Sequence, residues 1–156
     1  MHAFPSTTVR TTRRVLLAIL ALGLVGTETE LLLLKHTDGF WQLAPLALIG
    51  LALVVLAWHL LRRSRASVRA LQAVMAAFLV SGGAGVLLHF RGNVEWEIER
   101  VPGLGGLDLF RQAIMGATPT LAPGTMVQLG LVGLLYSYVN SSLDPSAGRP
   151  AGDPGS

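Results

Sequence analysis

The chain contains no cysteine, and this absence excludes disulfide bonds, thiolate metal sites and thiol redox chemistry. Charged residues are also scarce, at 13% of the sequence against 51% hydrophobic residues. The mean hydropathy of +0.56 is too high for an ordinary soluble domain. No basic stretch is interleaved with aromatic residues, so we expect no nucleic-acid partner. For a chain of 156 residues this composition predicts one domain embedded in a lipid bilayer.

What the sequence does contain is a set of long apolar runs. A helix needs about 20 apolar residues to cross a bilayer core of about 30 Å. Four runs reach this length, so we predict an all-α membrane protein built as a four-transmembrane-helix bundle. The predicted spans are about 15–34, 43–61, 70–90 and 121–140. The first also resembles a signal peptide, but its apolar residues resume beyond any cleavage site, so we expect it to be retained.

The ends of the chain differ from this transmembrane domain, which we place at 15–140. Residues 1–14 form a predicted N-terminal arm. Residues 141–156 are rich in Pro, Gly and Ser and are predicted to be a disordered tail. One lysine against eleven arginines, with abundant Leu, Ala and Gly, indicates a bacterial coding sequence rich in G and C.

The placement of arginine predicts the orientation. Three arginines precede the first span, and four lie between the second and third: Arg10, Arg13, Arg14, Arg62, Arg63, Arg65 and Arg69. Connections 35–42 and 91–120 instead carry most of the acidic residues. Positive charge favours the cytoplasmic side. We therefore expect a multi-pass protein of the bacterial inner membrane, with both termini in the cytoplasm and these two connections outside.

The connection 91–120 is the longest segment outside the predicted spans. In NVEWEIER, Glu95, Glu97 and Glu99 alternate with apolar residues, which predicts an extended segment with one acidic edge. With Asp38, these glutamates form a predicted acidic outer rim. The following DLFRQAIMG has apolar residues at helical spacing, with Asp108 as a candidate N-cap. We predict a short amphipathic helix there, lying on the membrane surface or capping the bundle.

Polar residues inside the spans indicate where a site would lie. Glu30 shares a helix face with small residues, whereas Glu28 shares its face with leucines and is assigned to lipid contact or ordinary packing. A membrane-embedded carboxylate is expected to face the bundle interior or a cavity. His89 and Gln128 also lie on small-residue faces near the outer ends of their spans. We therefore predict an outward-facing polar pocket formed by Glu30, His36, His89, Thr125 and Gln128.

This pocket leaves several chemistries open. Glu30, His36 and His89 are candidate ligands for a divalent cation, although no compact metal motif is present. A Glu–His pair can also relay protons, and the same polar residues can simply hydrogen-bond across helices. We expect binding, passage or delivery of a cation or small ligand, and a homodimer fits this role. The alternative is a non-catalytic accessory or assembly subunit of a larger membrane complex. We identify no catalytic residues, and the sequence favours a non-enzymatic role without deciding it.

Two stretches resemble a known group of proteins. ETELLLLKHTDGFWQLAPL, and LLHFRGNVEWEIE followed by GATPTLAPGTMVQLGLVGL, are similar to small four-span bacterial inner-membrane proteins of no established function. The resemblance covers most of 27–136. It implies the four-helix architecture, assigns no catalytic residue, and implies that the recurring positions are Glu30, His36, Asn93, Glu95, Glu97 and Glu99.

Overall fold

The computed structural model describes residues 7–141, which form five α-helices and no strand. The helices are α1 (Thr7–Leu33), α2 (Phe40–Arg62), α3 (Arg65–Arg100), α4 (Gly106–Ile114) and α5 (Gly124–Ser141). The prediction of an all-α protein is confirmed for this part of the chain. Beyond Ser141, the tail for which disorder was predicted lies outside the described residues.

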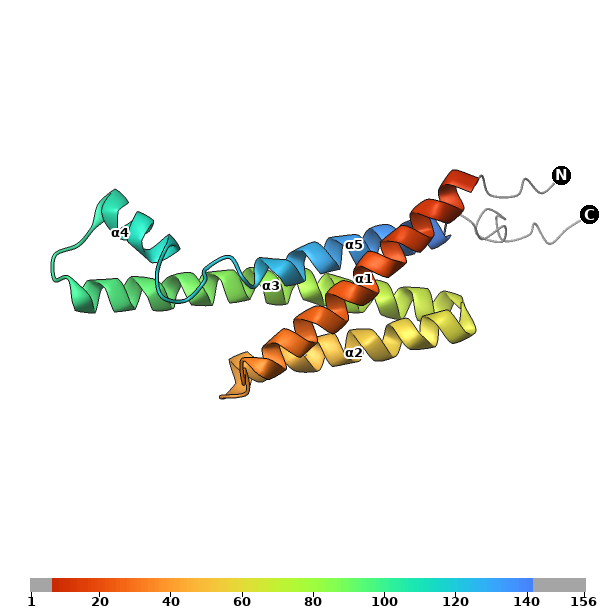
Figure 1. Cartoon of the computed structure of the whole chain (residues 1–156), viewed down its shortest axis with the longest axis horizontal. Coiled ribbons are helices and arrows are strands. Elements are labelled where there is room, and N and C mark those ends of the chain that lie inside the picture. Colours follow the sequence, from red (N-terminus) through yellow and green to blue (C-terminus); the bar gives the residue numbers. More distant parts are fainter. Residues whose placement is uncertain (1–6, 142–156) are drawn as a thin grey trace, which may run out of the picture.

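Four of the helices pack as a bundle (Figure 1). α3 packs between α2 and α5. α1 contacts both α5 and α2 and crosses from one to the other. The start of α1, the turn between α2 and α3, and the end of α5 meet at one end of the molecule, which we call the arginine-rich end. The opposite end, which we call the far end, carries α4.

Within residues 7–141, three helices are long and apolar enough to cross a membrane: α1, α2 and α3. The prediction of a membrane protein with transmembrane helices is therefore supported. α5 is not among these three; it has 18 residues and includes Gln128, Tyr136 and Asn140. A crossing by α5 stays a prediction, although α5 packs in the bundle against α3 and is crossed by α1.

The core of the bundle combines bulky side chains with close backbone contacts. Leu20, Ile49, Met75 and Phe78 are fully buried between the four helices. At Gly82, an added Cβ would lie 2.9 Å from both the Pro123 carbonyl oxygen and the Val127 amide nitrogen. Small residues in membrane helices permit this kind of approach. The SGGAG run of α3 therefore packs against α5 within one molecule.

The structure corrects the prediction for NVEWEIER. These residues are not extended; they continue α3 without interruption to Arg100. α3 itself contains no proline and no left-handed glycine. The first helix breakers follow it: Pro102 disfavours helical geometry at Val101, and Gly103 has φ +90°. The alternation that indicated a strand is also compatible with a helix, because Asn93 and Glu97, four residues apart, share its buried face.

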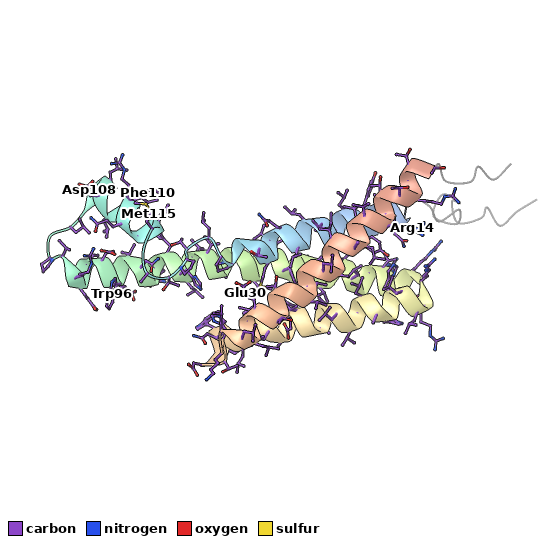
Figure 2. All side chains as sticks on the ribbon, viewed as in Figure 1. Arg14, Glu30, Trp96, Asp108, Phe110 and Met115 are labelled. Atoms are coloured by element: carbon purple, nitrogen blue, oxygen red, sulfur yellow. The ribbon has the colours of Figure 1, made fainter. Side chains whose placement is uncertain are left out.

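The predicted short helix is present as α4, but its details differ. The N-cap is Gly105, and Asp108 lies in the first turn, where its negative charge is favourable toward the helix dipole. Among the helices, α4 contacts only α3, so it does not cap the four-helix bundle. It folds back along the end of α3 (Figures 1 and 2). The Phe90 and Phe110 ring centroids lie 5.8 Å apart.

Candidate functional site

A groove of about 970 Å³ lies between α2 and α3. It exists because the start of α2 follows α1 away from α3, while the end of α2 stays against α3 at the short turn (Figure 1). Pro123, just before α5, and Met126, in its first turn, complete its wall. The volume falls within the range of small-molecule sites, about 300–1,000 Å³.

The groove is apolar along one part and polar at the other. Toward the arginine-rich end it is lined by Ala47, Leu48, Leu51, Ala77 and Val80. Toward the far end its lining includes the polar side chains His36, Gln42, His89 and Thr118 beside Trp41 and Leu88, with Ser81 between the two parts. The two ends of the groove therefore present different chemistry, and a ligand that fits both has an apolar body and a polar head.

Two of the predicted pocket residues line the groove, and three do not. His36 and His89 come to it from opposite walls, and both are partly buried. Glu30, Thr125 and Gln128 are exposed, and none of them lines the groove. Figure 2 shows Glu30 near the end of α1. Within residues 7–141, no three His, Asp or Glu side chains gather closely enough to hold a metal ion.

Glu28, rather than Glu30, faces another helix. Its Oε1 atom would lie 4.0 Å from a Cβ added at Gly50 of α2, and its Oε2 atom is buried with no hydrogen-bond partner. The prediction that Glu28 belongs to a leucine face contacting lipid or packing in the ordinary way did not include the crossing of α1 over α2. This crossing turns the face of Glu28 toward Gly50. Leaving a buried polar atom unpaired costs roughly 1–3 kcal/mol.

We expect Glu28→Leu to raise the free energy of unfolding by about 1–3 kcal/mol, because it removes this unpaired oxygen. Thermal unfolding in detergent would measure the change. Glu30→Leu is the matched control and is expected to have little effect, since Glu30 is exposed on the same helix. A loss of stability in Glu28→Leu would mean that the carboxyl group has a stabilising partner.

The residues of the predicted acidic rim differ in their exposure in the structure. Asp38, Glu95 and Glu99 are exposed, but Glu97 is buried at 6% exposure. Glu97 Oε2 accepts hydrogen bonds from Arg100 at 2.6 Å and 3.1 Å, and Arg100 also donates to Gln112 of α4 at 3.1 Å. Glu97 therefore helps to join α3 to α4.

Asn93 is the central polar residue of this region. Its Nδ2 atom donates to Ala113 O (2.9 Å), Thr118 O (2.7 Å) and Thr120 Oγ1 (3.0 Å), and its Oδ1 atom accepts from the Thr118 amide (3.1 Å). Only 2% of its surface is exposed. Gly116 packs directly on it, because an added Cβ would lie 2.7 Å from Asn93 Cγ. The side-chain amide thus holds segment 113–120 against α3.

This fixed segment shapes the polar end of the groove. His89 Nδ1 lies 3.0 Å from the Pro119 carbonyl oxygen, so that nitrogen carries the proton and donates to it. Thr118, which Asn93 holds, lines the groove next to His89. In the sequence, only a resemblance drew attention to Asn93. The spacing of Asn93, Glu97 and Arg100, at four and three residues, is a helical pattern that could have located the contact between α3 and the segment around α4.

Comparisons with known proteins do not name a family for this chain. No family model matches it, and no curated protein or solved structure shows significant similarity to it.

Proposed function

We propose that this protein binds an amphiphilic small molecule in the groove between α2 and α3. The observation that carries the proposal is the change from apolar to polar lining along the groove. The apolar part suits an alkyl chain, and His36 suits a carboxylate or another acceptor group at the far end. His89 donates its Nδ1 proton to Pro119, so its Nε2 atom offers an acceptor to a donor group of the ligand, such as the hydroxyl of a protonated carboxyl group. Because only two histidines of the predicted cation-binding set reach the groove, the geometry favours an amphiphile over a bare cation.

The charge distribution supports an orientation for this site. The arginine-rich end would face the cytoplasm, and α4 with the far end of the groove would face the outside. The bundle would cross the bacterial inner membrane four times, with α5 as the fourth span. The ligand would then reach the groove from the outer leaflet of the bilayer.

Photo-crosslinking tests this proposal. Protein in phosphatidylcholine nanodiscs would be labelled with a diazirine-bearing fatty acid, with and without excess unlabelled fatty acid, and the labelled peptides mapped. We expect saturable labelling on the groove-lining faces of α2 and α3. Ala47→Trp, which fills the groove, should abolish the saturable fraction. Ala57→Trp is the matched control, since Ala57 is exposed on the same helix outside the groove.

The polar end has its own prediction. His36→Ala is expected to weaken fatty-acid binding about tenfold, because a hydrogen bond to a charged group contributes roughly 1.5–3 kcal/mol. The measurement is the concentration of unlabelled fatty acid that halves the saturable labelling. Thr37→Ala, at the adjacent exposed residue, should bind as the unchanged protein does. If labelling were unsaturable, and the protein held a stoichiometric metal that is lost in His36→Ala and in His89→Ala, the bound ligand would be a cation and the proposal of an amphiphile would be wrong.

The alternative, an accessory subunit, is favoured by one observation at the far end. α4 and its C-cap carry exposed apolar side chains, and α4 lies beyond the bundle (Figure 2). They are Leu107, Phe110, Ile114 and Met115. Under this alternative, Phe110→Ser would release a co-purifying partner while leaving fatty-acid labelling of the groove unchanged. The two functions are thereby separated.

A further inference from the structure

His89, on the α3 wall of the groove, has a hydrogen-bonding role that the backbone fixes. Its Nδ1 atom lies 3.0 Å from the Pro119 carbonyl oxygen, which can only accept, so this nitrogen carries the proton. In a neutral imidazole the other ring nitrogen, Nε2, is then an acceptor. Because His89 lines the groove, the α3 wall offers a ligand an acceptor there rather than a donor.

Gln42, at the same end of the groove, has the opposite role on the α2 wall. Its Oε1 atom accepts a hydrogen bond from the Asp38 amide at 2.9 Å. This bond fixes which end of the side-chain amide is the oxygen, and the Nε2 group at the other end donates. Gln42 also lines the groove. The polar end thus carries a donor on one wall and an acceptor on the other.

The Pro119 carbonyl group, which sets the role of His89, is held in place by buried hydrogen bonds on both sides. Before it in the chain, Asn93 bonds to the carbonyl oxygen and the amide of Thr118. After it, Asn93 donates to the hydroxyl group of Thr120. Asn93 and Thr120 are 2% and 3% exposed. The segment therefore cannot turn its carbonyl group away from His89 without breaking these bonds.

We propose that the groove selects an acyl amphiphile that carries a hydroxyl group beside its carboxyl group. This inference rests on the proposed function and names the head group of its ligand. The carboxyl oxygens accept from His36 and Gln42, and the hydroxyl group donates to His89 Nε2. A plain carboxylate has only acceptors, so it leaves His89 Nε2 without a donor, and a polar group left unpaired on binding costs affinity.

Competition against the diazirine-bearing fatty acid tests this head group in phosphatidylcholine nanodiscs. The competitors are palmitate, its α-hydroxy and β-hydroxy derivatives, and the matching methoxy ethers, each corrected for the amount that partitions into the bilayer. The ethers keep the added oxygen but lack its proton. We expect one hydroxy derivative to compete at about fivefold lower concentration than palmitate, which is the effect of one net hydrogen bond. Its methoxy ether should compete no better than palmitate.

Variants assign the preference to His89. His89→Phe keeps an aromatic ring but removes the acceptor, so the hydroxyl preference should disappear while palmitate competes as it does in the unchanged protein. Asn93→Leu, which frees the Pro119 carbonyl group, should weaken the preference in the same way. Ser81→Ala is the matched control, because Ser81 lines the groove between its two parts, away from the polar end. It should keep the full preference.

The outcomes separate this inference from the proposed function. Saturable labelling for which palmitate and both hydroxy derivatives compete equally would mean that the groove binds an amphiphile without recognising a hydroxyl group, and the inference would be wrong. A preference that survives in His89→Phe would also overturn it. Labelling that cannot be saturated would remove the proposed function, and this inference with it.

Discussion

Gly82→Val is expected to lower the free energy of unfolding by about 3 kcal/mol, at the upper end of the usual cost of overpacking. A Cβ at this position meets the Pro123 carbonyl oxygen and the Val127 amide nitrogen at 2.9 Å. Both are backbone atoms, so no rotamer change in α5 can relieve the contact. The helices must separate instead, and separation opens the most extensive interface of the bundle. Thermal unfolding in detergent, followed by circular dichroism, measures the loss.

Gly83→Val provides the control for this prediction. The two glycines are adjacent on α3, so the change in helix propensity is the same, but no heavy atom lies within 4 Å of a Cβ added at Gly83. We expect Gly83→Val to melt close to the unchanged protein. Equal melting temperatures for the two variants would show that α3 and α5 do not meet at Gly82.

Asn93→Leu is expected to detach segment 113–120 from α3. Leucine has nearly the shape of asparagine but none of its polar atoms, so the Thr118 carbonyl and amide groups lose their partner. Each buried group left unpaired costs roughly 1–3 kcal/mol, and the total is about 3 kcal/mol. Because this segment lies beyond the bundle, the loss should be local. Hydrogen exchange of the peptide containing 113–120 should become much faster while exchange in α1 and α2 stays slow.

Two further substitutions define what Asn93 contributes. Asn93→Asp keeps the acceptor for the Thr118 amide but loses the donor of three hydrogen bonds, so its exchange should be intermediate. Glu95→Leu, at an exposed position two residues further along α3, should leave exchange of 113–120 unchanged. If Asn93→Leu left the segment equally protected, packing alone would hold it and the amide would have no structural role.

Apolar length was enough to predict three of the long helices, because it depends only on local composition. The same rule failed to predict where α3 ends, because residues 91–100 are too polar for a membrane span yet contain no helix breaker. Glu95, Glu97 and Glu99 also repeat every two residues, and this regularity concealed the helical pair formed by Asn93 and Glu97. A search for breakers at Pro102 and Gly103 would have placed the boundary correctly.

The sequence predicted correctly only two of the residues that line the groove. His36 lies in the connection between α1 and α2, His89 lies within α3, and both reach the groove. Glu28 and Glu30 point about 200° apart around α1. Which of them faces α2 depends on how α1 crosses α2, and this crossing is set by packing that involves the whole bundle. Of the small residues on the face of Glu30, Gly26 is exposed and Gly23 packs against Leu129 of α5, while Gly50 on α2 receives Glu28. Residue type on one helix carries no information about the glycine on its neighbour.

Because α3 is continuous, its end forms a rigid extension that carries α4 beyond the bundle. About 12 residues of α3 extend past the start of the bundle, which makes an arm of about 18 Å at 1.5 Å per residue. α4 is fastened to this arm through Asn93, Glu97 and Phe110. A tilt of about 10° at the base would therefore displace its tip by about 3 Å, with no loop to absorb the motion. Any change in spacing between α2 and α3 would thus be amplified at a surface outside the bundle.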